Sequence, residues 1–577
     1  MNKELLKEMF HFTKNGKETI IIGIILVLQL IIYTFSYPFI MKEIVDKAIP
    51  EGNMKIVVIL SFILIAIILL RFITNSYTEV RRKSCCYNNN NEIKEKLFKN
   101  IQESKISKIE QLQIGNLFEV VFNQSYEASQ LFVWNFVGII SVRLALTIAI
   151  SIILLLLNMK LGLIVISIFV LSYCILIPIY AKTMKVYKKL QSMLVDLQAS
   201  VNEYIDSYAT TKTLRLEEIN LEQIQEMLEK AKKEMIIASK IIAMHNGLFS
   251  ILTFSATIAI MIVGGNELLL GIGSSSTIML MIDYVDDINR HMKSLLEHVH
   301  SLNNRYTCFI NVLKISKIEK EVDNGNKKLE NINNIEFKNV SLSYDGINIV
   351  LENINLKVEK PMQIAIVGKS GTGKTSLINL LPRFYEINSG NILINGIDSR
   401  EYKLEELRKN IAYVFQEPVI FEKSISDNIR YGNKNNISQE QIEKVCKQIG
   451  LDKKIYELPN GYDCIISAKT DLLSYGEKQL LSFARAILKQ ADLILLDEVT
   501  SNLDLEFEEN VMEAMKEMLQ NKISFVIAHR LNTIKNSDLI LFLEDKHIIE
   551  AGTHKELMQA KGKYYELYSS KKDKVTI

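Results

Sequence analysis

The first half of the chain alternates between long apolar runs and long polar segments. A helix needs about 20 mainly apolar residues to cross the hydrocarbon core of a bilayer. Five runs approach or reach that length, and a weaker sixth follows them. These predicted spans are Thr19–Ile40, Ile56–Ile73, Val133–Leu157, Leu161–Tyr180, Asn246–Gly264 and about Leu268–Ile288. The pattern predicts an all-α transmembrane domain of six helices.

Polar segments separate the spans in two places, between the second and third and between the fourth and fifth. Each is roughly 55 to 65 residues long, well beyond an ordinary loop, and both are rich in Lys and Arg. The short connection around Gly271–Ser276 contains neither residue type. Because basic loops stay on the cytoplasmic side, we expect both chain ends and both long segments in the cytoplasm. The long segments are predicted to be helices that protrude below the membrane.

The second half has a different sequence pattern, in which short segments rich in β-branched residues, typical of strands, alternate with helical segments. Predicted strands are Ile364–Val367, Ile392–Ile394, Ile411–Phe415, Leu493–Leu496 and Ile523–Ile527. This alternation is typical of an α/β domain with a mostly parallel sheet. The charged segment Lys314–Asn334 indicates a linker. We therefore predict a transmembrane domain over 1–313, a linker over 314–334 and an α/β domain over 335–577.

Composition narrows the classes of function. The formal net charge of +2 argues against a dedicated nucleic-acid-binding protein. The spacing of the six cysteines fits neither a zinc site nor a disulfide framework, so we expect reduced thiols. The first apolar run, from Thr19, has no small-residue cleavage site, which favours a retained membrane helix over a signal peptide.

One glycine-rich motif in the second half carries specific chemistry. The sequence Gly368-Lys-Ser-Gly-Thr-Gly-Lys374-Thr375 follows a predicted strand and precedes a helix that we expect to begin near Ser376. In this context glycines let backbone N–H groups surround phosphate oxygens, the lysine reaches the β- and γ-phosphates, and the threonine ligates Mg²⁺. The motif predicts a site for ATP and Mg²⁺. Its residues are Gly368, Ser370, Gly371, Gly373, Lys374, Thr375 and Ser376.

Two carboxylates follow the buried strand Leu493–Leu496. Asp497 is predicted to hold the hydration shell of Mg²⁺, and Glu498 to orient and polarise the attacking water. His529 ends the next apolar strand. A lone histidine there is usually structural, but beside phosphate-binding residues a contact with the γ-phosphate is the better interpretation.

With these motifs in place, the second half resembles the ATPase domain of ABC transporters, because further motifs follow in that family's order. Tyr344 matches the aromatic residue that stacks on adenine, and Gln416 matches the Q-loop residue that senses Mg²⁺ and faces the membrane domain. The resemblance implies catalytic roles for Glu498, His529 and Gln416, and metal contacts for Thr375 and Gln416. It assigns the signature and dimer contact to Ser474, Gly476, Glu477 and Asp504.

The order of the two halves resembles that of exporter half-transporters. The resemblance implies a dimer, with a second copy or a homologous half-transporter, in which Ser474 and Gly476 of one subunit close over ATP bound at Lys374 of the other. It implies a multi-pass protein of the cell membrane with a cytoplasmic ATP-binding domain. The expected activity is ATP-driven export of an amphipathic drug-like compound, peptide or lipid.

Alternatives stay open within this architecture. A lipid flippase, an importer-like use and one half of an obligate heterodimer are compatible with the motifs. A soluble ABC-type ATPase that acts on ribosomes or DNA is disfavoured by the apolar spans.

The signature motif departs from the family's usual Leu-Ser-Gly-Gly-Gln. Here it reads Leu473-Ser-Tyr-Gly-Glu477, which keeps the serine and the second glycine. Tyr475 is bulky, and we expect a competent but slower site. For transmission to the membrane, the predicted docking segments near Gln416 are Gly115–Gln124 and Asp206–Arg215.

Ionisable residues inside a membrane are costly and point to function. Arg143 falls in the third predicted span, while Asp283, Asp286 and Asp287 fall at or near the end of the sixth. Three- and four-residue spacing puts the aspartates on one helical face. One interpretation is an acidic wall in the translocation cavity that receives a cationic amphiphile or a basic peptide. The other is a structural pair between Arg143 and an aspartate, or a cluster in the cytoplasmic extension of the helix.

Overall fold

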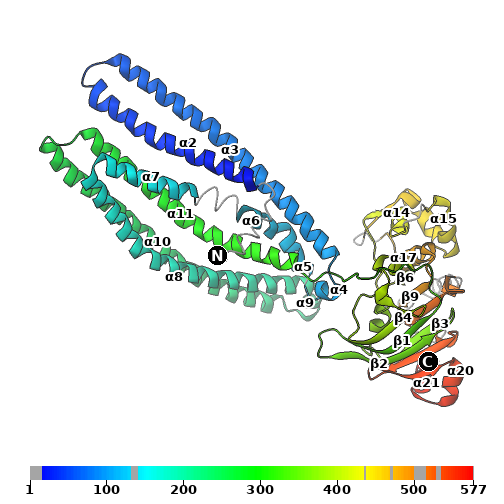
Figure 1. The fold of residues 1–577 in the computed structure, drawn as a ribbon. Helices are drawn as coiled ribbons and strands as arrows, with labels where there is room; N and C mark the ends of the chain where they lie inside the picture. Colours follow the sequence, from blue (N-terminus) through cyan, green and yellow to red (C-terminus); the bar gives the residue numbers. More distant parts are fainter. Residues whose placement is uncertain are drawn as a thin grey trace. The chain divides into compact units, whose positions relative to one another are not determined.

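The computed structural model of the chain contains two compact units (Figure 1). The residues that it describes are 16–112, 114–131, 141–433, 437–467, 472–498, 515–516, 518–527 and 534–575. Met1–Gln102 and Gln113–Ile318 form one unit, here called the helical unit. Glu103–Leu112 and Glu319–Ile577 form the other, here called the sheet unit. The predicted linker, 314–334, is thus divided between the two units.

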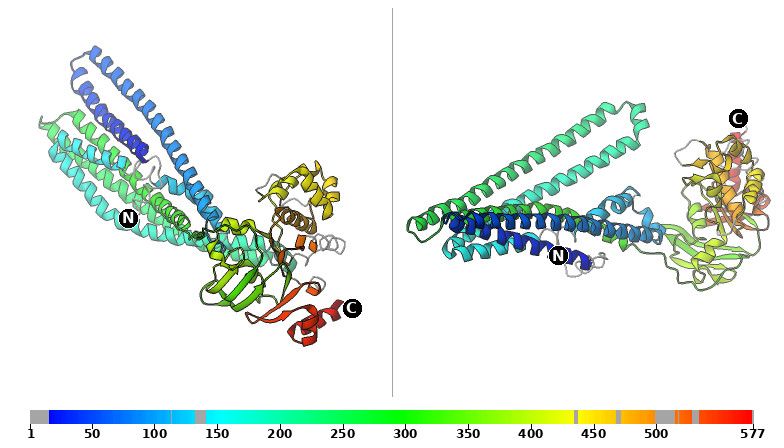
Figure 2. Two further views of the ribbon diagram at one scale, coloured as in Figure 1. Left: turned by 45° about the vertical axis from the view of Figure 1, so that its right-hand side comes forward. Right: turned by 90° about the horizontal axis from the view of Figure 1, so that it is seen from above.

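Six helices of 17 or more residues dominate the described part of the helical unit. They are α2 (Gly16–Glu43), α3 (Met54–Gln102), α7 (Ser141–Leu157), α8 (Met159–Asp206), α10 (Glu217–Leu269) and α11 (Ser275–Ser316). Shorter pieces connect them: η1 (Ile44–Ala48), α5 (Ile114–Glu119), η2 (Val120–Gln124), α6 (Ser125–Gln130) and α9 (Tyr208–Leu214). Helices α8 and α10 pack against each other and are joined at one end through α9 (Figure 2).

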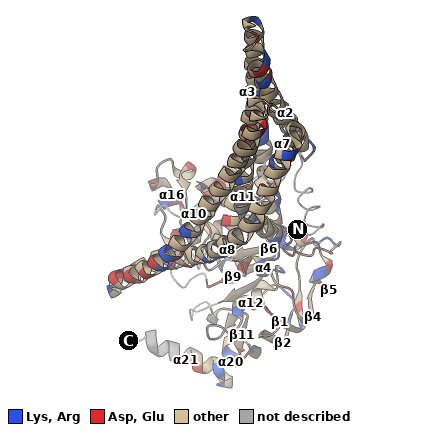
Figure 3. Ribbon diagram, turned by 90° about the vertical axis from the view of Figure 1, so that its left-hand side faces the viewer, with Lys and Arg blue, Asp and Glu red and all other residues tan. Residues whose placement is uncertain are grey.

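Several of these helices are much longer than a bilayer is thick. The 49 residues of α3 rise about 70 Å at 1.5 Å per residue, against a hydrocarbon core of about 30 Å. Figure 3 shows α2 and α7 almost free of charged residues, whereas one end of α10 is dense in both signs of charge. Four described helical segments are long and apolar enough to cross a membrane: Lys17–Ala48, Met54–Gln102, Met159–Val186 and Glu217–Leu269.

Two predicted spans need comment. The first part of the third span, 132–140, lies outside the described residues, and its remainder is the apolar helix α7. The sixth span was predicted to begin near Leu268, which is wrong. Helix α10 ends at Leu269, and α11 begins at Ser275 after a turn in which Gly271 has φ +72°. Ser274 caps α11 by accepting a hydrogen bond from the Thr277 N–H, so the helix start is set by a local side-chain cap.

The centre of the sheet unit is a six-stranded sheet. Its order is β12 (His547–Gly552), β11 (Leu539–Glu544), β3 (Gln363–Val367), β10 (Ile523–Ile527), β9 (Leu493–Asp497) and β6 (Ile411–Val414). All neighbouring pairs are parallel except β11 with β12. The sheet confirms the predicted α/β domain. Successive residues of β3 enter opposite cores, since Ile364 and Ile366 lie in one buried cluster and Ala365 and Val367 in the other.

A second, antiparallel sheet was not predicted. Its order is β2 (Ile349–Val358), β1 (Ile335–Ser343), β4 (Ser389–Ile394) and β5 (Ile397–Asp398). Because β1 and β2 are joined by a short hairpin, they pair directly, and β4 joins the far edge of β1. Its side chains, among them the buried Phe337, share a core with β3 and β10.

Helices and short strands complete the sheet unit. The helices are α12 (Lys374–Asn379), α13 (Leu404–Lys409), α14 (Ile425–Arg430), α15 (Gln439–Gln448), α16 (Asp452–Glu457), α17 (Tyr475–Lys489), α20 (His554–Ala560) and α21 (Lys563–Val575). The strands β7 (Lys423–Ser424) and β8 (Ile465–Ile466) form an antiparallel pair. Helix α17 packs on β6, and its buried Leu480 and Phe483 belong to the same core cluster as Ala365 and Val367 of β3.

A short segment of the first long polar excursion belongs to the sheet unit. Ser104 forms an antiparallel bridge with Lys320, the Lys105 N–H donates to Glu319 O at 3.0 Å, and α4 (Ile106–Glu110) follows. The predicted docking segment Gly115–Gln124 belongs to the helical unit, where η2 packs against α11, and its docking near Gln416 stays a prediction. The pairing of Ser104 and Lys105 with Glu319 and Lys320 joins segments about 215 positions apart. Hydrophobic periodicity along the chain does not reveal such a contact.

The predicted linker residues from Glu319 onward are fastened to the sheet unit. The Glu321 carboxylate accepts a bidentate pair from Arg408, with both distances 2.8 Å. Asp323 Oδ1 accepts from the Leu404 N–H at 3.1 Å, and Arg383 Nη2 donates to Val322 O at 3.2 Å. A bidentate arginine–carboxylate pair fixes geometry as well as contributing energy.

Gly390 offers a test of the antiparallel sheet. Its φ is +82°, and a Cβ there would lie 2.3 Å from the carbonyl oxygens of Lys338 and Asn339, beside an irregularity in the β1–β4 pairing. Gly390→Ala is expected to destabilise the sheet unit by about 2 kcal/mol or more, through both left-handed backbone and steric overlap. We expect the apparent melting temperature of the purified full-length chain in detergent to fall by about 5 °C or more.

Gly396→Ala is the matched control for this prediction. Gly396 has φ +78° in the β4–β5 hairpin, but a Cβ there meets nothing within 4 Å. It carries the backbone cost without the overlap, so its melting temperature should fall less. Equal shifts for the two variants would contradict the steric argument.

Candidate nucleotide-binding site

The glycine-rich loop connects β3 to α12, which begins at Lys374 and so two residues before the predicted start. The Lys374 side chain is buried at 6% exposure, and its Nζ donates to Gly368 O at 3.1 Å and Lys369 O at 2.8 Å. The ammonium group is therefore folded into the loop. A buried cation surrounded by a curled backbone is an arrangement that recognises phosphate.

Thr375 and Asp497 meet beside this loop. Asp497 is the last residue of β9 and is 5% exposed, and its Oδ1 accepts from Thr375 Oγ1 at 3.3 Å. A hydroxyl and a carboxylate are hard oxygen donors of the kind that Mg²⁺ takes. No group of three or more His, Cys, Asp or Glu that could hold a metal occurs among the described residues. The pair therefore fits an ion that is bound largely through nucleotide phosphates, as Mg²⁺ usually is.

Gln416 and Glu498 form the next pair. Gln416 follows β6 in the chain, and its Nε2 donates to Glu498 Oε2 at 3.1 Å. Glu498 has φ +48°, a left-handed conformation that costs a non-glycine residue of order 1 kcal/mol or more. Such a conformation directly after a buried strand turns the carboxylate away from the core and towards Gln416.

Tyr344 contacts the first turn of α12. Its hydroxyl donates to Ser376 Oγ at 2.8 Å, and its ring meets that of Tyr385 edge-on with 4.7 Å between centroids. Burial raises the pKa of the Tyr344 phenol. Tyr385 in turn donates to Glu110 Oε2 at 2.7 Å. Sequence reasoning missed Tyr385 and Glu110, because no local pattern marks a contact over 275 positions.

The signature segment forms the start of α17. Ser474 is the N-cap in a capping box: its Oγ accepts from the Glu477 N–H at 3.3 Å, and Glu477 Oε2 accepts from the Ser474 N–H at 2.6 Å. Glu477 is 7% exposed. Gly476 lies in the first turn of the helix. Since glutamate and glutamine both serve in a capping box, the change from the usual glutamine keeps the local structure.

Two predicted residues lie outside the described residues. Asp504 falls in the segment 499–514 and His529 in the segment 528–533. Their predicted roles therefore rest on the sequence.

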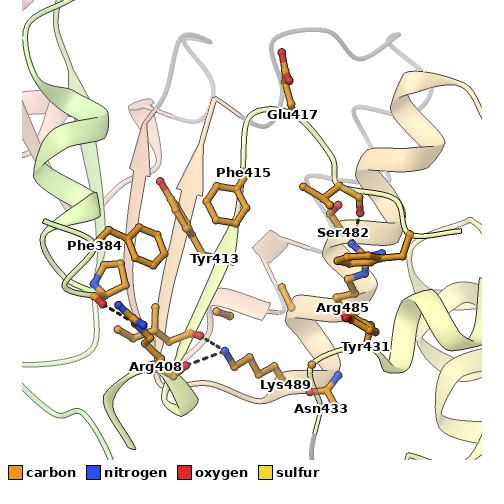
Figure 4. Close-up of a pocket in the computed structure, with 17 residues that line it drawn as sticks. Phe384, Arg408, Tyr413, Phe415, Glu417, Tyr431, Asn433, Ser482, Arg485 and Lys489 are labelled. Carbon is orange, nitrogen blue, oxygen red and sulfur yellow. Dashed lines mark hydrogen bonds between the residues drawn. The ribbon is translucent and has the colours of Figure 1, made fainter. Parts of the chain in front are cut away.

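An aromatic groove lies next to Gln416 within the sheet unit (Figure 4). Its volume is about 380 Å³, and Tyr413, Phe415 and Phe384 line one wall. On its floor Lys489 Nζ donates to the carbonyl oxygens of Arg408 and Ile411, so this cation is already paired. Burial lowers the pKa of Lys489. The groove is preformed, and the predicted docking of Asp206–Arg215 near Gln416 stays a prediction.

The predicted cargo residues lie elsewhere, in the helical unit. Arg143 Nη1 lies 2.7 Å from His291 Nδ1, so its described hydrogen-bond partner is a histidine where we had considered an aspartate. Asp283 and Asp286 are exposed, while Asp287 is half-buried and forms an ion pair with Arg290. All three aspartates lie in the third and fourth turns of α11, near its start, whereas the sequence placed them at the end of a span.

Comparison with known proteins agrees with this arrangement. Residues 20–285 match the ABC transporter transmembrane region, and residues 351–501 match the ABC transporter family. An ATP-dependent lipid A-core flippase of Pseudomonas fluorescens is 31% identical over 72% of this chain and 69% of its own length. YgaD of Bacillus subtilis, a protein named for multidrug export, is 29% identical over 98% of this chain and 99% of its own.

A solved structure shares the fold as a whole. The structure of a bacterial Atm1-family ABC exporter with ATP bound superposes with a TM-score of 0.82 at 21% identity, over 96% of this chain and 98% of that one. The helical and sheet units therefore correspond to the two halves of one known architecture. The chain belongs to the ABC transporter family as an exporter half-transporter, in which a transmembrane region is fused to an ATPase domain that drives export with ATP.

Proposed function

We propose that this chain, with a second copy of itself or with a homologous half-transporter, moves an amphipathic cargo out across the cell membrane. The observation that carries the proposal is one connected set of contacts: Lys374 folded into the phosphate loop, Thr375 on Asp497, and Gln416 on Glu498. A chain with all these groups supplies its own half of the catalytic equipment. The relatives named for multidrug export and for lipid A-core transport support a drug-like or lipid cargo, and a peptide remains the third class.

Residue roles follow from these contacts and from the family pattern. In the proposed site Lys374 and the loop amides bind the ATP phosphates, and Tyr344 leaves Ser376 to stack on adenine. Mg²⁺, when bound, neutralises phosphate charge, and Thr375, Asp497 and Gln416 would hold it.

Glu498 would orient and polarise the attacking water, at the carboxylate that Gln416 already contacts. His529 is proposed to contact the γ-phosphate. The left-handed backbone of Glu498 supports this role, since strained residues cluster at functional sites.

The dimer completes each site in this proposal. Ser474, Gly476, Glu477 and Asp504 of one subunit would meet ATP held by the other. The Ser474 oxygen accepts from the Glu477 N–H, which leaves the hydroxyl proton available for a phosphate oxygen. Closure driven by ATP and release by hydrolysis is then a population shift between two states.

The orientation rests on charge. The polar ends of the long helices are rich in Lys and Arg, and the turn between α10 and α11 has neither, which supports a cytoplasmic ATPase domain.

The proposed acidic wall lies in the third and fourth turns of α11. Asp283 lies eight residues into α11, about 12 Å from its start. A helix that starts at the outer membrane surface would carry this carboxylate inside the hydrocarbon core, not in a cytoplasmic extension. There an acidic face with Asp286 would favour a cationic amphiphile.

The rate of ATP hydrolysis tests the proposed role of Glu498. Glu498→Gln, in the purified chain in lipid nanodiscs, is expected to lower ATP turnover by at least about 100-fold, because the general base is lost. ATP binding should persist. Glu457→Gln, on the exposed surface of α16, is the control and should turn over at the wild-type rate. Wild-type turnover by Glu498→Gln would contradict the proposal, and nucleotide binding without any turnover by the unmodified chain would indicate an obligate partner subunit.

The affinity for ATP tests the proposed role of Lys374. Lys374→Met should weaken ATP binding by roughly 30- to 100-fold, the loss expected of a charge-assisted contact. Lys369→Met is the matched control, since this loop lysine is exposed and faces Glu544 at 3.7 Å. Nucleotide titration by fluorescence measures both. Comparable affinity in the two variants would argue against the phosphate role of Lys374.

The preference for a cationic over a neutral compound tests the proposed acidic wall of α11. Asp286→Asn combined with Asp287→Asn should reduce stimulation of ATP turnover by a cationic amphiphile and leave stimulation by its neutral analogue unchanged. Asp196→Asn is the control, because Asp196 is an exposed aspartate of α8 that lies outside both predicted docking segments. An unchanged preference between the two compounds would remove the acidic-wall hypothesis.

A further inference from the structure

Tyr475 stands where the family's signature motif usually has glycine, and its side chain makes a specific contact. The Tyr475 hydroxyl donates to the main-chain carbonyl of Gln416 at 2.6 Å. Four residues later, Gln479 Nε2 donates to the carbonyl of Phe415 at 3.3 Å. Residues four apart share one face of a helix. The first turns of α17 therefore bind two successive carbonyls of the segment that leaves β6.

Both ends of this connection are held in place. The capping box of Ser474 and Glu477 fixes the start of α17, and Gln479 is fully buried. At the other end, Gln416 Nε2 donates to Glu498 Oε2. A continuous path of hydrogen bonds thus runs from the Tyr475 hydroxyl through the backbone and side chain of Gln416 to the Glu498 carboxylate.

We infer that the Tyr475 hydroxyl is a positioning group for ATP hydrolysis, which holds the Gln416 backbone so that its amide stays on the Glu498 carboxylate. Glycine at this position has no atom that could form the bond. The path also links the signature helix of the chain to the water-activating residue of the same chain. This inference rests on the proposed function, because it takes Glu498 as the group that polarises water.

The alternative role for Tyr475 is packing by its ring. Tyr475 is 38% exposed, so its ring is not enclosed by a core. Its hydroxyl, in contrast, has a defined partner in the Gln416 carbonyl. Tyr475→Phe keeps the ring and removes only the donor. Tyr456→Phe is the matched control, because Tyr456 is exposed on α16, in the same part of the sheet unit.

The experiment measures steady-state ATP turnover of full-length transporter in lipid nanodiscs, with its partner subunit if the chain alone does not turn over ATP. Tyr475→Phe should lower kcat by about threefold to tenfold, the effect of one net hydrogen bond. The KM for ATP and the melting temperature should equal those of wild type, because the partner of the removed hydroxyl is the Gln416 carbonyl, outside the glycine-rich loop. Tyr456→Phe should match wild type in all three.

Each other outcome overturns the inference. An unchanged kcat shows that the hydroxyl positions nothing, and a lowered melting temperature or a parallel change in KM shows a structural role. Glu498→Gln is measured alongside: if it leaves turnover intact, the proposed function itself fails. If it abolishes turnover while Tyr475→Phe has no effect, only this inference fails.

Discussion

The parallel register of β3, β10, β9 and β6 is the constraint on which the site depends. Ile527 pairs with both Ile366 and Asp497, and Leu496 pairs with Val414, so the carboxyl ends of these strands lie at one edge. The glycine-rich loop follows β3, Glu498 follows β9 and Gln416 follows β6. Residues 82 and 122 positions apart, Gln416 with Glu498 and Thr375 with Asp497, meet because parallel strands end together, and ligands in open α/β sheets bind at that edge. A shift of one residue in the register of β9 would turn the Asp497 side chain to the opposite face of the sheet.

Local chemistry explains why the unusual signature sequence is tolerated. Its serine and glutamate cap each other, and its tyrosine finds a carbonyl acceptor on the neighbouring loop. Each departure from the usual motif therefore has a partner within the same unit. The Ser474 oxygen accepts from the Glu477 N–H in this cap, so its proton can still be donated to another group.

Sequence alone predicted the glycine-rich turn between a strand and a helix, and the strand that ends at the two carboxylates, because these features are local. The Gly-rich turn and the apolar run before Asp497 are each contained within a few residues. The pairing of β4 with β1, the contact of Tyr385 with Glu110 and the bond from Tyr475 to Gln416 were not predicted, because each joins segments that are far apart in the chain. The start of α11 was misplaced for a different reason: hydropathy continues through Leu268–Leu270, while the turn is set by Gly271 and the Ser274 cap.

The inclusion of Glu103–Leu112 in the sheet unit has a consequence for the order of synthesis. About 200 residues separate this segment from Glu319, its partner, so a ribosome adding 5 to 20 residues per second leaves it unpaired for about 10 to 40 s. The sheet unit therefore pairs its edge with a piece of chain that is made long before the rest of the unit. A fragment that begins at Glu319 would lack that piece, and with it the Glu110 carboxylate that Tyr385 contacts in the full chain.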